Sequence, residues 1–72
     1  MTQQNTTDTQ IIQHVPSGEL YAVRWGQDGY AIEAAGPLHH SEVEQARTEG
    51  FDSDPETVEW INEHSNDFNP RG

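Results

Sequence analysis

Strand-forming residues between positions 11 and 35, broken at two places by turn residues, constrain the fold of this chain more than any other feature. Residues 11–15, 20–26 and 30–35 are rich in β-branched and aromatic residues, which favour extended backbone. The segments between them contain Gly together with Pro or Asp, and these residue types form turns. The pattern predicts a three-stranded antiparallel β-meander with strand order 1-2-3.

The second turn also predicts which residues pair. Asp28-Gly29 suits a two-residue type I′ turn, and this turn sets Arg24 opposite Glu33 and Trp25 opposite Ile32. Opposite charges and apolar side chains then meet across the strands. A four-residue loop would shift the pairing by two residues and keep the same faces. In either case the residues expected on the buried face are Ile12, Tyr21, Val23, Trp25, Tyr30, Ile32 and Ala34.

Two short helices are expected after the sheet. Ser41 and Glu44 have the spacing of a capping box, which predicts a helix over about 42–49. Asp54 is a favourable N-cap residue. The Pro55 that follows it suits the first helical position, where no amide donor is lost. The second helix is therefore predicted over about 55–64.

These elements predict an α+β domain in which both C-terminal helices pack on one face of the sheet. The domain is expected to cover residues 11–66. Residues 1–10 contain no apolar residue after Met1, which is typical of a disordered polar tail, and residues 67–72 are expected to form a flexible tail.

The chain contains 13 acidic residues, three arginines and no lysine, for a formal net charge of −10. Direct binding to nucleic acid is therefore not expected, because it depends on cationic side chains that displace counterions from phosphates. The charge is uneven. Residues 39–72 hold nine acidic residues and two arginines, a net of −7, whereas residues 11–38 hold three acidic residues and one arginine, a net of −2.

This asymmetry favours a small interaction or regulatory module that presents an acidic helical face to a basic protein partner. A sharper version is a nucleic-acid mimic whose carboxylates imitate phosphates. Trp60 falls between the apolar and acidic arcs of the second helix, where it can anchor a partner or close the edge of the core. The predicted partner-binding residues are Glu42, Glu44, Glu56, Glu59, Trp60 and Glu63.

Salt adaptation is the alternative explanation of the acidity. Halophilic proteins carry excess negative charge as a means of staying hydrated, and lysine is missing from the whole chain rather than from one surface. Such a domain would act through homo-oligomerisation, or by binding a small ligand on the open sheet face around Arg24. A homodimer through the first strand, the third strand or the helices would suit such a domain, because both outer strands of a three-stranded sheet leave a free edge.

Enzymatic activity, cofactors and catalytic residues are not expected. Carboxylates are plentiful, but a chain of 72 residues has little room for the cleft that would tune their pKa values. His39, His40 and His64 are the alternative candidates for metal ligands. Adjacent histidines point in different directions, however, and no His-x-x-x-His pattern is present, so that no metal site is expected.

The sequence also bears on the cellular compartment. No apolar run approaches the length of about 20 residues that a membrane-spanning helix needs, and no signal-peptide pattern is recognisable. Cysteine is absent, so that disulfides cannot form. A cytoplasmic protein with no membrane partner is expected.

Overall fold

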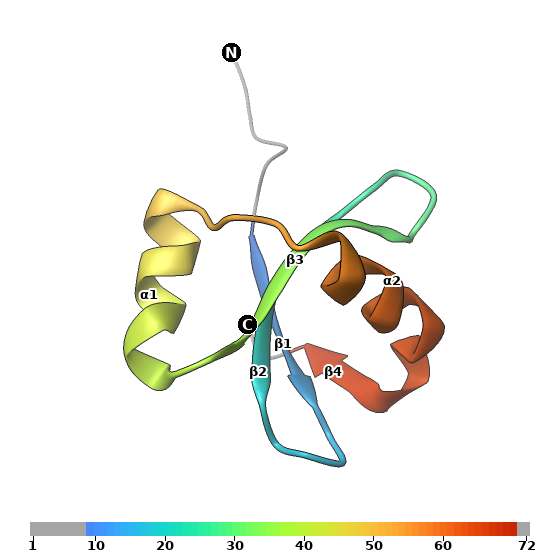
Figure 1. Cartoon of the computed structure of the whole chain (residues 1–72), viewed down its shortest axis with the longest axis horizontal. Helices are drawn as coiled ribbons and strands as arrows, with labels where there is room; N and C mark the ends of the chain where they lie inside the picture. The colour runs from blue at the N-terminus through green and yellow to red at the C-terminus, as the bar shows by residue number, and fades with distance from the viewer. Residues whose placement is uncertain (1–8, 71–72) are drawn as a thin grey trace.

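The sheet of this protein has four strands rather than three. The computed structural model describes residues 9–70, and the sheet is antiparallel with strand order β3-β2-β1-β4 (Figure 1). The α+β class is confirmed, whereas the three-stranded sheet was a wrong prediction. The elements are β1 (Gln10–His14), β2 (Leu20–Trp25), β3 (Ala31–Leu38), α1 (His40–Glu49), α2 (Pro55–Glu63), the 3-10 helix η1 (Ser65–Asp67) and β4 (Phe68–Pro70).

The additional strand, β4, comes from the segment that was expected to be a flexible tail. It pairs with β1 so that Phe68 lies opposite His14 and Asn69 opposite Gln13. Phe68 also packs against the buried cluster on one side of the sheet. A three-residue strand with a single large apolar residue has no recognisable alternation, which is why the sequence did not reveal it. Residues 71–72, and residues 1–8 of the predicted N-terminal tail, lie outside the described part of the chain.

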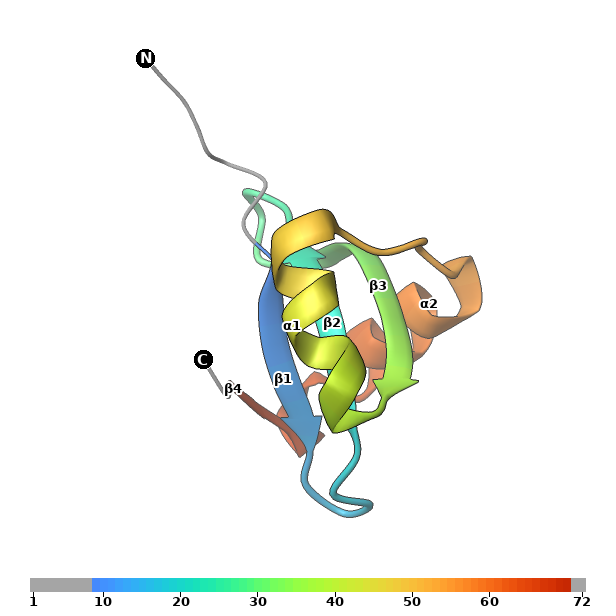
Figure 2. The same ribbon diagram turned by 90° about the vertical axis from the view of Figure 1, so that its left-hand side faces the viewer.

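The two helices lie on opposite faces of the sheet, and the prediction that they share one face was wrong. Figures 1 and 2 show the sheet between them. Successive residues of a strand point to opposite faces, and both Ile11-Ile12 and Ala22-Val23 are buried pairs. Each face therefore has an apolar surface that one helix covers. We call these faces the α1 side and the α2 side.

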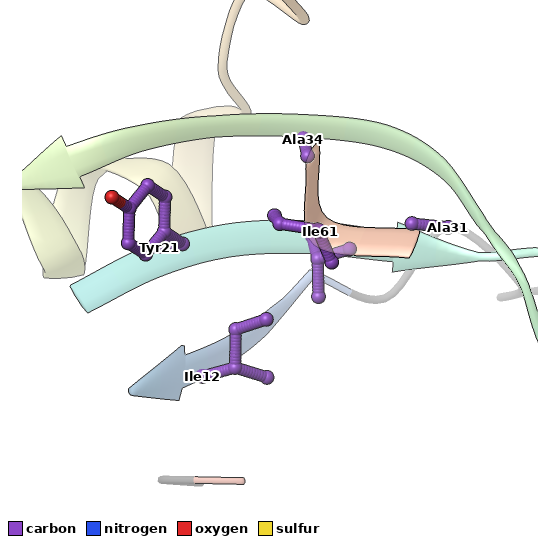
Figure 3. Close-up of a cluster of buried hydrophobic side chains, with 6 residues drawn as sticks. Ile12, Tyr21, Ala31, Ala34 and Ile61 are labelled. Atoms are coloured by element: carbon purple, nitrogen blue, oxygen red, sulfur yellow. The ribbon is translucent and has the colours of Figure 1, made fainter. Parts of the chain in front are cut away.

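Each side has its own small core. On the α2 side, Ile61 of the helix is fully buried among strand residues (Figure 3). On the α1 side, the helix contributes one buried residue, Ala46. The α2-side cluster comprises Ile12, Tyr21, Val23, Ala31, Ala34 and Ile61, and the α1-side cluster comprises Ile11, Ala22 and Ala46.

A β-bulge near the second turn changes which residues are buried. Arg24 lies opposite Glu33 as predicted, but Trp25 lies opposite Ala31, so that Ile32 is an extra residue in β3. Ala31 consequently takes the buried position, with 4% of its surface exposed. Ile12, Tyr21, Val23 and Ala34 are buried as predicted. The burial predicted for Trp25, Tyr30 and Ile32 was wrong. The bulge shifts the alternation of β3 at Tyr30 and Ile32, whereas Trp25 is the last residue of β2 and keeps 37% of its surface exposed.

The helix starts agree with the sequence pattern for α2 and differ for α1. Asp54 caps α2 by accepting hydrogen bonds from the Glu56 amide (3.2 Å) and the Thr57 hydroxyl (3.0 Å). Helix α1 begins earlier than Ser41: its N-cap is His39, whose amide donates to Glu42 Oε1 (2.8 Å). Because β3 continues to Leu38, the helix starts at the first residue that the strand leaves free, and the capping carboxylate is Glu42 instead of Glu44.

Neither strand edge proposed for a homodimer is freely available. β1 lies inside the sheet, between β2 and β4. On the outer edge of β3, the Asn62 side chain accepts from the Ala31 amide (2.8 Å) and donates to the Ala31 carbonyl (3.1 Å). The Ala34 amide donates to Ser53 Oγ (3.1 Å), and the Ala34 carbonyl accepts from the Asp54 amide (2.8 Å). The α1–α2 connection and α2 thus protect this edge from strand addition.

None of the helices in residues 9–70 has the length and apolar character needed to cross a membrane.

Candidate functional site

Three carboxylates form a single row on the outer surface of α2. Glu56, Glu59 and Glu63 are spaced by three and four residues, so they lie on one side of the helix, and all three are exposed. At 1.5 Å per residue the row is about 10.5 Å long. We call it the acidic stripe. Among residues 9–70 the one salt bridge is Arg24–Glu33, so the stripe is not neutralised by a described cation.

The remaining predicted carboxylates lie elsewhere. Glu42 and Glu44 are exposed on α1, on the other side of the sheet from α2. One carboxylate oxygen of Glu42 already accepts a hydrogen bond from the His39 amide. The structure therefore divides the predicted partner-binding residues between two opposite surfaces. A single acidic helical face containing all of them does not form.

The arginines make the two sides different in charge. Arg24 lies on the α1 side, where its guanidinium is 5.3 Å from the centroid of the Phe51 ring and its Nη1 donates to Glu33 Oε1 (2.5 Å). Arg47 lies in the last turn of α1. Both arginines in the described residues thus belong to the α1 side. The α2 side presents its carboxylates without an arginine from residues 9–70.

Trp60 lies beside the acidic stripe and is half-buried. Its ring packs among four other rings, with centroid distances of 4.9 Å to His14, 5.3 Å to Tyr21, 5.4 Å to Phe68 and 5.5 Å to His64. We call these five residues the aromatic group. Trp60 therefore closes the edge of the α2-side core and keeps part of its ring accessible, so its two predicted roles are compatible.

Sequence reasoning identified Trp60 but missed the group around it. The alternation of β1 places His14 on the same face as Ile12, which was the one available signal. His14 also lies 5.0 Å from Phe68 between ring centroids, and its Nδ1 is 2.8 Å from Ser17 Oγ. Phe68 could not be placed because its strand was not predicted.

A hollow of about 250 Å³ lies between the aromatic group and the start of α2. The Tyr21 ring, which forms part of its wall, lies directly against Gly36, where any Cβ would overlap the ring. Trp60 and Glu56 place an aromatic ring and a carboxylate at the same hollow. Its full lining is Tyr21, Gly36, Pro37, Asp54, Glu56, Thr57 and Trp60.

The Tyr21 hydroxyl in this wall is uncharged at neutral pH. Burial raises the pKa of Tyr21 above its ordinary value of 10.0, and the negative charge of Glu19 raises it further. Tyr21 therefore adds no charge to the α2 side, whose negative potential comes from the carboxylates alone.

The alternative sites are less well formed. His39 and His40 lie at the start of α1, whereas His64 lies at the end of α2 with its Nδ1 2.9 Å from the Trp60 carbonyl. The structure does not bring these histidines together, and residues 9–70 contain no group of three side chains placed to hold a metal ion.

The sheet face around Arg24 is not open as predicted, because α1 and Phe51 cover it. A hollow of about 500 Å³ remains there. Its lining mixes Arg24 with three carboxylates, those of Glu42, Glu49 and Asp52. Arg24 is itself paired with Glu33, and ligand binding at Arg24 stays a prediction.

Comparison of the chain with protein-family models, with curated proteins and with solved structures gave no match in any of the three.

Proposed function

We propose that this protein is a small interaction module that binds a basic protein partner through the outer surface of α2. The observation that carries the proposal is the acidic stripe beside a half-buried tryptophan, on the side of the sheet that has no arginine among the described residues. Like charges three and four residues apart on a helix repel one another. A row of carboxylates without counter-charges therefore destabilises the folded protein. Binding to a cationic surface would offset this loss of stability.

The two components of the surface have different tasks in this proposal. The carboxylates attract and orient a basic partner, which raises the association rate at low ionic strength. Trp60 supplies contact area at the border of the stripe, and tryptophan is enriched among residues that dominate binding energy. The hollow between Trp60, Tyr21 and Glu56 receives one side chain of the partner, and a lysine or arginine fits because its stem is apolar and its end is cationic.

The nucleic-acid mimic is the less favoured version of this function. The acidic stripe has about one charge per 5 Å of helix axis, whereas one strand of B-DNA has one phosphate per about 3.4 Å. Extending the row would require the carboxylates of α1, which lie on the opposite side of the sheet. We therefore propose a protein partner with a compact basic patch instead of a protein that tracks a long phosphate row.

The experiment compares two variants of equal charge. Glu56→Gln/Glu59→Gln/Glu63→Gln removes the acidic stripe, and Glu44→Gln/Glu49→Gln/Asp52→Asn removes three exposed carboxylates from the α1 side. A partner captured from native lysate is purified, and its affinity for the wild type and both variants is measured by calorimetry at several salt concentrations. We expect the first variant to lose binding and the second to retain it. Equal effects of the two variants would contradict the proposal.

Salt adaptation is the second candidate, favoured by the absence of lysine from the whole chain. It predicts that the protein is poorly folded in dilute buffer and gains structure in molar KCl, where the carboxylates are screened. Circular dichroism in both conditions tests it. An unchanged spectrum would leave the interaction surface as the explanation of the acidity.

A further inference from the structure

Exposed apolar side chains gather at the hairpin that joins β2 and β3. Trp25, Tyr30 and Ile32 are 37%, 61% and 60% exposed, and they account for three of the four large exposed apolar residues in the described chain. The fourth, Val15 (54% exposed), follows β1 at the opposite end of the sheet. We call Trp25, Tyr30 and Ile32 the hairpin patch. Single exposed apolar residues are common, whereas three within one hairpin form a candidate contact surface.

Local contacts position Trp25 and Ile32 and close the hairpin. The indole N–H of Trp25 donates to Gln10 Oε1, and the hairpin is closed by the Gly26 amide donating to the Tyr30 carbonyl (2.8 Å). Ile32 Cγ2 packs over Gly26, only 3.0 Å from where a Cβ of that residue would lie. The bulge that exposes Ile32 is part of the same arrangement. Side chains that are already positioned in this way, Trp25 and Ile32, lose less conformational entropy on binding.

The charge of the hairpin indicates which occupant fits. Residues 24–33 contain two acidic residues and one arginine, a net of −1, although the whole chain has a net charge of −10. Glu33 is paired with Arg24, so that Asp28 is the one acid in this segment without an ion pair to a described residue. Two copies of an acidic chain repel each other least where they present such a surface, whereas a basic partner finds the acidic stripe on α2 instead.

We propose that the hairpin patch is the contact surface between two copies of this chain. The same patch on each copy forms a two-fold symmetric, self-complementary contact. The contact is made by side chains and not by strand addition, because the outer groups of β3 at Ala31 and Ala34 already have partners. This inference does not depend on the function proposed for α2, since it uses different residues.

The dimer is expected to be weak and to strengthen with salt. A stable interface buries about 800 Å² on each partner, which is more than three partly exposed side chains supply, so a dissociation constant of about 10 µM to 1 mM is expected. Added salt screens the repulsion between two chains that each carry −10. This dependence is opposite in sign to that of a basic partner on the acidic stripe.

The test is sedimentation velocity of the full chain over about 10 µM to 1 mM, in dilute buffer and in 1 M NaCl. We expect a concentration-dependent dimer that is more populated in 1 M NaCl. Tyr30→Ser/Ile32→Thr lowers the association constant by roughly tenfold or more, since each lost apolar contact is worth up to about tenfold. Val15→Ser, the matched control at the other end of the sheet, changes it by less than about twofold. Circular dichroism verifies that each variant is folded.

A monomer at every concentration and salt would overturn the proposal, as would a dimer that Tyr30→Ser/Ile32→Thr leaves intact or that Val15→Ser weakens equally. If the chain is monomeric and Tyr30→Ser/Ile32→Thr instead loses the partner bound by α2, the hairpin patch belongs to that interface and the homodimer is wrong. In that case the function proposed for α2 would survive the failure of this inference.

Discussion

Asn62 of α2 hydrogen-bonds to the outer edge of β3, and its replacement by alanine tests that arrangement. Its amide group makes two hydrogen bonds to Ala31, of 2.8 and 3.1 Å, next to the bulge in β3. Hydrogen bonds of this kind contribute about 0.5–1.5 kcal/mol each. Water can reach an edge strand and replace part of the loss. We therefore expect Asn62→Ala to lower the free energy of unfolding by about 1–2 kcal/mol.

The loss is large for this protein, because a domain of this size has a total free energy of unfolding of about 3–9 kcal/mol. Urea unfolding followed by far-ultraviolet circular dichroism measures the change, and amide hydrogen exchange at Ala31 locates it. Asn66→Ala is the matched control, since Asn66 is exposed in η1, and its effect should stay within about 0.5 kcal/mol. Unchanged protection of the Ala31 amide in Asn62→Ala would refute the account of this edge.

Three further predictions concern the α2-side core, its helix cap and the buried tyrosine. Ile61→Ala removes a fully buried side chain and should lower the free energy of unfolding, measured in urea, by about 2–5 kcal/mol. Val43→Ala, at a half-buried position of α1, should lower it by less. Asp54→Ala removes both cap hydrogen bonds of α2 and should cost about 0.5–2 kcal/mol, with a loss of helical signal; an unchanged stability would mean that Pro55 alone starts the helix. The pKa of Tyr21 is raised in the folded state, so the unfolded chain releases this proton first and stability should fall as the pH rises above about 10; Tyr21→Phe should reduce that fall, and an identical pH profile would contradict it.

The structural features that the sequence predicted correctly depend on residues that lie close together in the chain. The cap of α2 follows from Asp54 and Pro55, whose preferences are set by the backbone groups of one helical turn. The pairing of Arg24 with Glu33 follows from a short hairpin. The acidic stripe follows from the helical period alone, because the spacing of Glu56, Glu59 and Glu63 defines one side of any helix.

What the sequence did not reveal depends on contacts between distant segments. Ile11-Ile12 and Ala22-Val23 make both faces of the sheet apolar, yet no local pattern says which helix covers which face. The bulge at Ile32 is a one-residue insertion, and it reverses the alternation on which the predicted burial of Tyr30 was based. Phe68 lies in a strand because its backbone pairs with β1 and its ring packs against Trp60.

The same limit applies to the candidate site. Periodicity placed Trp60 next to the carboxylates of α2, and the structure agrees. Glu42 and Glu44 could share that surface only if both helices lay on one side of the sheet, and they lie on opposite sides. The hollow beside Trp60 could not be predicted from the sequence, because Gly36 and Pro37 of β3 line it together with residues of α2 that are distant in the chain.

The central claim is that the partner binds the α2 side, and mapping by nuclear magnetic resonance tests it most directly. The partner is added stepwise to the ¹⁵N-labelled full chain, and shifts are followed at backbone amides and at the two indole N–H groups. We predict shifts at residues 56–63 and at the Trp60 indole that are reversed by added salt, with residues 40–49 of α1 unaffected. Shifts centred on α1, or binding that is indifferent to salt, would contradict the account.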